Sequence, residues 1–172
     1  MRFPATIILF CLFPAAFPGC ADRVDNEFHR QELLNLNKKM RIAHLEGDAE
    51  TIISSHAYPY VAVKNGQVSR PSPEDHAARF NSYMASMDVT AWDDLIEPIV
   101  VISDDASLAT VIYRKHLSMV PTSQPDSEPY EGIYVWQSTY RRTAEGWKQI
   151  SDILTALPEN ETIEELKALN SR

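Results

Sequence analysis

Cysteine is almost absent from this sequence of 172 residues, and the two that it has, Cys11 and Cys20, lie within the first 20 residues. A folded domain after residue 20 therefore has no disulfide and no thiol site of its own. The sequence also lacks a Gly-rich phosphate-binding loop, a long run of Lys and Arg, and an internal repeat. These absences argue against a phosphate-loop nucleotide site and against a repeat architecture.

Basic residues are the second shortage. The sequence has 16 Lys and Arg against 24 Asp and Glu, which gives a formal net charge of -8. Such a surface repels phosphate backbones, so we expect no nucleic acid as a partner. With 44% hydrophobic and 23% charged residues, the chain has the composition and the length of one globular domain.

The longest apolar run stands at the N-terminus. It extends over residues 3–17, directly after Met1 and Arg2, and is too short to span a membrane and remain there. We therefore interpret residues 1–20 as a signal peptide that is not part of the fold.

Two processing routes fit this signal. Gly19 and Cys20 resemble the end of the lipobox of bacterial lipoproteins, whereas Phe17 and Pro18 depart from its usual Leu and small residue. By this route Cys20 is the lipidation site, and the protein is a membrane-anchored lipoprotein of the bacterial cell envelope that faces the periplasm or the exterior. The alternative is ordinary cleavage at a small-x-small site just before Asp22, which gives a soluble periplasmic or secreted protein.

Two helices are predicted before residue 56. Apolar residues with a 3-4-3 spacing indicate a helix over about residues 26–45 with one buried face. Gly47 ends that helix, and Asp48 is placed to cap a second, short helix through Ser55. A third helix begins at Ser72 and Pro73. Its predicted apolar stripe consists of Phe80, Tyr83, Met84 and Met87.

The remaining segments alternate as strands do. A hairpin is predicted over residues 58–70 with Asn65 and Gly66 at its turn, and two longer strands over residues 92–102 and 107–120, with Pro98 at an edge or bulged position of the first. In the second, the core face carries Ala109, Val111, Tyr113, Leu117 and Met119. A loop with three prolines, residues 121–129, precedes a long hairpin over residues 130–157 that turns at Gly146.

Three features accompany this order of elements: the Gly-Asp break after the first helix, the Asn-Gly hairpin and the closing turn from Tyr140 to Lys148. Together they resemble the nuclear transport factor 2-like superfamily and are closest to its SnoaL-like branch. We assign residues 22–157 to this domain and residues 158–172 to a tail with a short helix. The resemblance implies an α+β fold, the cystatin-like α+β barrel. In it a cone-shaped curved antiparallel sheet packs on three N-terminal helices around an internal pocket. It also implies a homodimer that forms through the sheet.

Enzymes on this fold use an acid or base such as Asp or His together with a hydrogen-bonding Tyr. Asp152 is the candidate catalytic residue, because it stands between Ile150 and Leu154 on one strand face, where burial would raise its pKa. The alternative is an Asp152 that is wet or hydrogen-bonded near the strand end. The catalytic residues are otherwise unknown from the sequence.

A set of aromatic residues could line the pocket for a small apolar or aromatic ligand. The candidate ligand-binding residues are Tyr60, Tyr113, Tyr134, Trp136 and Asp152. Ordinary packing in the core is the alternative.

His116 alternates with Arg114 and Ser118, which places it on a solvent or dimer face, and the histidines do not have the spacing of a metal site. We therefore expect no metal and no cofactor.

Three functions remain open at this point. The first is binding of a small molecule or a partner in the pocket without catalysis. The second is an isomerase, dehydratase or hydrolase that uses Asp152 and a tyrosine. The third is a structural dimer module of the envelope. An ionisable residue beside a tyrosine hydroxyl inside the cone would favour catalysis, whereas an entirely apolar interior would exclude it.

Overall fold

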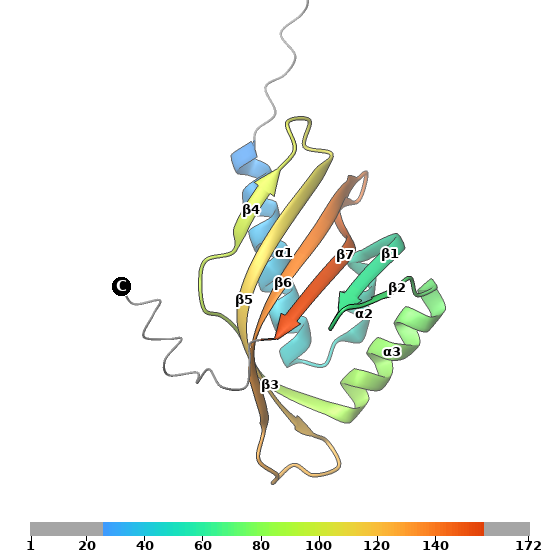
Figure 1. Ribbon diagram of the computed structural model, residues 1–172, viewed down its shortest axis with the longest axis vertical. Helices are drawn as coiled ribbons and strands as arrows, with labels where there is room; N and C mark the ends of the chain where they lie inside the picture. The colour runs from blue at the N-terminus through green and yellow to red at the C-terminus, as the bar shows by residue number, and fades with distance from the viewer. Residues whose placement is uncertain (1–25, 157–172) are drawn as a thin grey trace, which may run out of the picture.

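The computed structural model describes residues 26–156, which form three helices and seven strands (Figure 1). The predicted signal peptide, Cys20 and the predicted helical tail lie outside these residues. Within them, no helix is long and apolar enough to cross a membrane. The elements are α1 (Asn26–Leu45), α2 (Ala49–Ser54), β1 (His56–Lys64), β2 (Gln67–Ser69), α3 (Pro73–Ser86), β3 (Met87–Asp94), β4 (Ile99–Ile102), β5 (Leu108–Pro121), β6 (Tyr130–Thr143) and β7 (Gly146–Ala156).

The helix signals in the sequence are confirmed. α1 buries Leu33 and Ala43 as its spacing predicts. The carboxylate of Asp48 accepts a hydrogen bond of 2.9 Å from the backbone N–H of Thr51, which caps α2. Ser72 caps α3 through a hydrogen bond of 3.1 Å from the backbone N–H of Asp75.

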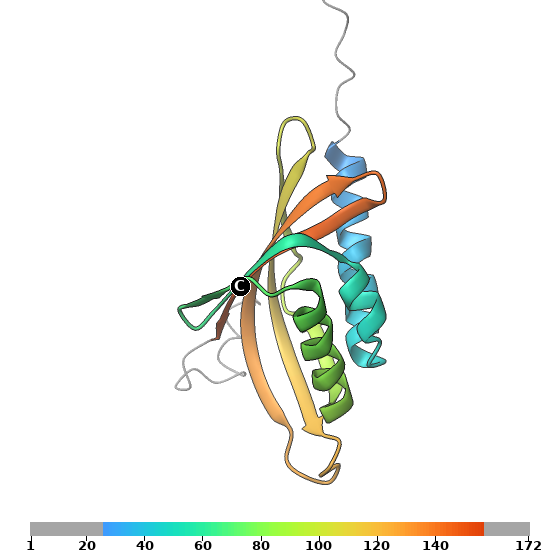
Figure 2. The same ribbon diagram turned by 90° about the vertical axis from the view of Figure 1, so that its right-hand side faces the viewer.

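The sheet has the strand order β2-β1-β7-β6-β5-β3, and β4 also pairs with β5. Figure 2 shows that all three helices lie on one side of this curved sheet. The expected α+β fold, with a curved sheet over N-terminal helices, is therefore confirmed. One face of the sheet is covered by helices, and the other faces away from them.

Two details of the expected sheet are wrong. β1 and β7 pair in parallel, with Ala62 opposite Asp152, so the sheet is mixed rather than antiparallel. No tight hairpin joins these strands, since α3 and five strands lie between them in the sequence, and nothing local fixes their relative direction. The sheet also does not close into a barrel, because β2 and β3 are at its two edges.

The single strand predicted over residues 92–102 is also wrong. β3 begins already at Met87, which the helical stripe had assigned to α3, and it ends at Asp94. β4 begins only after Pro98. Pro98 has no N–H to donate to a ladder, so the strand is interrupted there. β3 and β4 then pair with successive parts of β5.

The long hairpin of β6 and β7 forms as predicted, with Gly146 at φ 102° in its turn. A bulge shifts its register, since Thr139 is opposite Ser151 whereas Tyr140 is opposite Gln149. The extra residue, Ile150, is left without a partner. As a result Gln149, and not Ile150, shares a face with Asp152 and Leu154. The predicted face of this strand is corrected accordingly.

The hydrophobic core lies where α1 packs on the half of the sheet next to the β6–β7 turn. Its buried members are Leu33, Ala109, Val111, Tyr113, Tyr140 and Trp147. On the other face of the sheet, Ile99, Val101 and Ile153 are exposed apolar residues. A homodimer that formed through the sheet would cover them, and that assembly stays a prediction.

Lys115 is a buried charged residue that the sequence pattern did not predict. Lys115 occupies a core-face position of β5 and is 3% exposed. Its Nζ donates a hydrogen bond of 2.6 Å to Asp94 Oδ1, and Asn37 Nδ2 of α1 donates one of 2.7 Å to Asp94 Oδ2. Burial lowers the pKa of Lys115, while the hydrogen bond to Asp94 acts against that shift. A buried ammonium group needs such a partner.

We expect Asp94→Ala to lower the free energy of unfolding by about 3 kcal/mol, because it leaves the buried ammonium of Lys115 without a counter-charge. Urea unfolding measures this change. The control is the double variant Asp94→Ala/Lys115→Met, which removes the charge as well and should regain most of the loss. A double variant no more stable than Asp94→Ala would contradict this reading of the ion pair.

Candidate functional site

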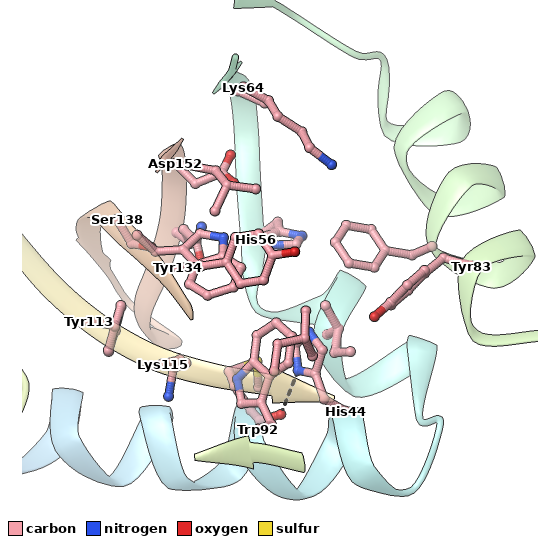
Figure 3. A pocket seen from close by; sticks show the side chains of 18 of the residues that line it. His44, His56, Lys64, Tyr83, Trp92, Tyr113, Lys115, Tyr134, Ser138 and Asp152 are labelled. Atoms are coloured by element: carbon pink, nitrogen blue, oxygen red, sulfur yellow. Dashed lines mark hydrogen bonds between the residues drawn. The ribbon is translucent and has the colours of Figure 1, made fainter. Parts of the chain in front are cut away.

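A cavity of about 380 Å³ lies between the helices and the concave face of the sheet (Figure 3). Its lining side chains come from α1, α2 and α3 and from β1, β3, β5, β6 and β7. The apolar part of this lining is larger than the polar part. This size and chemistry are typical of sites that hold a small organic molecule.

All five residues that the sequence predicts for ligand binding line this one cavity. They are Tyr60, Tyr113, Tyr134, Trp136 and Asp152. The strand alternation therefore separated the two faces correctly on β6, where Ser138 and Tyr140 also line the cavity. His116 lies on the other face of β5, with Nε2 3.8 Å from Glu131 Oε2, and takes no part in the site.

Asp152 and Tyr60 form the polar centre of the cavity. They come from the parallel strands β7 and β1, and Tyr60 Oη donates a hydrogen bond of 3.0 Å to Asp152 Oδ1. Burial raises the pKa of Asp152, whereas the Tyr60 hydrogen bond and the charges of Arg79 and Lys64 lower it. A carboxyl group whose pKa is raised by burial can exchange a proton closer to neutral pH than an ordinary Asp can.

Hydrogen bonds continue from this pair along the cavity wall. Gln149 Nε2 donates to Tyr60 Oη at 2.8 Å, and Tyr140 Oη lies 3.5 Å from Gln149 Oε1. Tyr113 Oη and Tyr140 Oη are 2.9 Å apart. Four strands thus contribute to one chain that begins at Asp152 and ends at Tyr113. Each buried hydroxyl in it has a partner.

The phenols of this chain are neutral groups. Burial raises the pKa of Tyr60, and the nearby charge of Asp152 raises it further. Burial likewise raises the pKa of Tyr113 and that of Tyr140. They can therefore donate hydrogen bonds at neutral pH but cannot act as phenolate bases.

The other end of the cavity is aromatic. Trp92 and Trp136 have ring centroids 5.1 Å apart, and Tyr134 packs 5.4 Å from Trp136. His44 of α1 stacks on Trp92 at 3.8 Å with an interplanar angle of 13°. In Figure 3, Lys64 and Asp152 lie at one end of the cavity, and Trp92 and His44 lie at the end next to α1. The site is therefore polar at one end and flat and apolar at the other.

A pair of histidines packs between α3 and β1, and His56 of this pair lines the cavity. His56 and His76 stack with centroids 4.8 Å apart, and Tyr58 Oη lies 3.1 Å from His76 Nδ1. Burial lowers the pKa of His56 to about 3 and that of His76 to about 4. Both rings are therefore neutral at physiological pH. The buried Nδ1 atom of His56 has no hydrogen-bond partner in the part of the chain that the structure describes.

Sequence reasoning missed the positively charged members of the lining, which are Lys64, Arg79 and Lys115. The alternation signal was present for two of them, since Lys64 follows Tyr60 and Ala62 on one face and Lys115 stands between Tyr113 and Leu117. Arg79 directly precedes Phe80 of the predicted apolar stripe. Over residues 26–156, no group of three His, Cys, Asp or Glu side chains is arranged to hold a metal ion.

The comparisons define the class of fold. Solved structures that share it include a candidate dehydratase of the nuclear transport factor 2-like family from Streptomyces avermitilis, with 16% identity and a TM-score of 0.64 over 77% of this chain and 99% of the other. A nuclear transport factor 2-like superfamily protein from Salmonella enterica serovar Typhimurium has 9% identity and the same TM-score over 81% and 98% of the two chains.

A nuclear transport factor 2-like protein with a cystatin-like fold from Novosphingobium aromaticivorans has 15% identity and a TM-score of 0.61 over 84% of this chain and 92% of the other. No protein-family model and no curated protein sequence matches this chain. The chain therefore has the nuclear transport factor 2-like fold, and identities this low show the fold alone.

The histidines make the stability of the fold depend on pH. Burial lowers the pKa of His44 to about 4, as it lowers those of His56 and His76. Below pH 6.5 these three side chains therefore take up protons in the unfolded chain but not in the folded one. We therefore expect the free energy of unfolding to fall as pH drops from 6.5 towards about 4. The raised pKa of Asp152 acts in the opposite direction, since the folded protein binds that proton first.

His56→Phe should make this decline shallower, because it removes one of the groups that protonate only in the unfolded chain. Urea unfolding at several pH values measures the slope. Phe80→Leu is the matched control, since it disturbs the ring that packs 5.6 Å from His56 without removing a titrating group. Equal slopes in the wild type and His56→Phe would contradict the assignment.

Proposed function

We propose that this domain binds a small organic molecule in the cavity, with its flat apolar part against Trp92 and Trp136 and its polar part beside Asp152. The observation that carries the proposal is the placement of all five predicted ligand-binding residues around one cavity of about 380 Å³. A molecule with two fused aromatic rings fits such a volume. The paired carboxyl and phenol groups of Asp152 and Tyr60 would orient it.

This proposal also explains why polar groups stand inside an apolar cavity. A purely structural module would stabilise itself better with an apolar interior, because each buried polar group costs free energy unless it is paired. The chain from Asp152 to Tyr113 keeps those groups paired where they line the cavity. The polar centre therefore favours binding over a solely structural role.

Binding of 2-naphthylmethanol tests the proposal, because Trp92 and Trp136 should report it as a change in tryptophan fluorescence. A neutral ligand of this size should bind with a Kd on the order of 0.1 mM. Trp136→Ala should weaken binding about fivefold, because it removes one aromatic contact. Tyr130→Ala is the matched control on the same strand, since Tyr130 is exposed and does not line the cavity. Equal losses in both variants, or no binding to the wild type, would contradict the proposal.

A second candidate function is an enzyme that moves a proton on the bound molecule. It is favoured by the raised pKa of Asp152 and by its hydrogen bond with Tyr60 inside the cavity. Asp152 would take a proton from a carbon next to a carbonyl group. Tyr60 would act as a positioning residue, because its hydroxyl already donates to Asp152 and accepts from Gln149. The dehydratase class named for the similar Streptomyces avermitilis protein also depends on proton transfer.

Deuterium exchange into 2-tetralone, followed by NMR, tests this candidate. Wild-type protein should speed up the exchange, and Asp152→Asn should reduce the acceleration by about a hundredfold or more, since the base is lost. Tyr60→Phe should keep part of the activity but move the acidic limb of its pH profile to higher pH, because the hydrogen bond that lowers the pKa of Asp152 is removed. Exchange no faster than in buffer would leave binding alone as the function, and full activity in Asp152→Asn would contradict the role of Asp152 as the base.

A further inference from the structure

The polar end of the cavity carries more positive than negative charge. Four charged side chains line the cavity: Lys64, Arg79, Lys115 and Asp152. Lys115 is neutralised by Asp94 at 2.6 Å. Two positive charges, on Lys64 and Arg79, therefore remain against the one carboxylate of Asp152. The excess is notable because the whole chain has a net charge of -8.

Lys64 and Arg79 are not held in ion pairs within the described part of the chain. Among residues 26–156, neither Lys64 nor Arg79 forms an ion pair with a carboxylate. Arg79 instead lies next to Phe80, with its guanidinium carbon 5.8 Å from the ring centroid. A cation on an acidic protein surface usually forms an ion pair with a carboxylate, so two that line a cavity without an ion pair are available to a ligand.

Their positions in the fold place both at the same end of the site. Lys64 follows Ala62 on β1, and Ala62 is the register partner of Asp152, so Lys64 is a diagonal neighbour of that carboxylate on the cavity face. Arg79 approaches from α3, and its charge acts on Asp152, His56 and His76. Figure 3 shows the Lys64 side chain extending from β1 towards the side of the cavity where α3 lies.

We propose that Lys64 and Arg79 form an anion subsite at the mouth of the cavity, and that the ligand class is a carboxylate attached to a flat apolar or aromatic body. The carboxylate lies between the two cations, and the rings extend past Asp152 to Trp136 and Trp92. The inference rests on the proposed binding function, and it adds the charge of the ligand and its direction in the cavity.

The site favours a carboxylate over an anion with more than one negative charge, because it can compensate only one. With Asp152 ionised, the two cations leave a net excess of one positive charge, which matches a monoanion. Lys64 and Arg79 are both exposed residues, so each contact is partly screened by water and salt. Selectivity should therefore be moderate and should depend on ionic strength.

A matched pair of probes tests the subsite: 2-naphthoate and 2-naphthamide have nearly the same shape and differ in charge. At low salt, we expect 2-naphthoate to bind wild-type protein about tenfold more tightly than 2-naphthamide, as measured by calorimetry or tryptophan fluorescence. In about 0.5 M salt the preference should shrink. In the double variant Lys64→Met/Arg79→Met the ratio of the two dissociation constants should fall to about one.

Lys38→Met is the control for net charge, because Lys38 is exposed on α1 and does not line the cavity, and it should keep the preference. Equal binding of the two probes to wild type, or an unchanged preference in the double variant, would overturn the anion subsite but leave cavity binding standing. Binding of neither probe would overturn both proposals. Unfolding curves of each variant show that any loss of preference occurs in folded protein.

Discussion

The need to pair polar groups that are removed from water governs this structure. Asp152 lies inside a cavity with a mostly apolar lining, and it is tolerable there because Tyr60 donates a hydrogen bond to it. Tyr60 is paired in turn with Gln149, and the chain continues to Tyr140 and Tyr113. One continuous set of partners thus runs across β1, β7, β6 and β5. The same rule explains Lys115, whose burial depends on Asp94.

Two irregular features of the sheet bring these groups together. The parallel pairing of β1 with β7 puts Tyr60 within hydrogen-bond reach of Asp152, although 92 positions separate them. The bulge at Ile150 turns Gln149 into the cavity, where it joins Tyr60 to Tyr140. A regular antiparallel hairpin would present Ile150 at that point. The polar centre, and with it the proposed ligand site, therefore depends on departures from regular sheet geometry.

Local signals predicted most of the fold. Asp48 and Ser72 cap helices as their sequence positions indicate, and alternation on β6 separated Tyr134 and Trp136 from Val135. Long-range features were not predictable in this way. The direction of β1 against β7 is set by how the chain packs, not by any residue pattern, and the break at Pro98 divides a segment that looks continuous. Lys115 was left out of the core face because a charge there requires Asp94, which is 21 positions away.

The proposed ligand lies in one cavity, with its charged end at β1 and α3 and its rings near α1. A crystal structure of the protein with 2-naphthoate tests this claim most directly. We predict electron density for the carboxylate between Lys64 and Arg79 and for the rings beside Trp136. Density for the ligand on the outer face of the sheet, near Val101 and Ile153, or with its carboxylate directed at Trp92, would contradict the account.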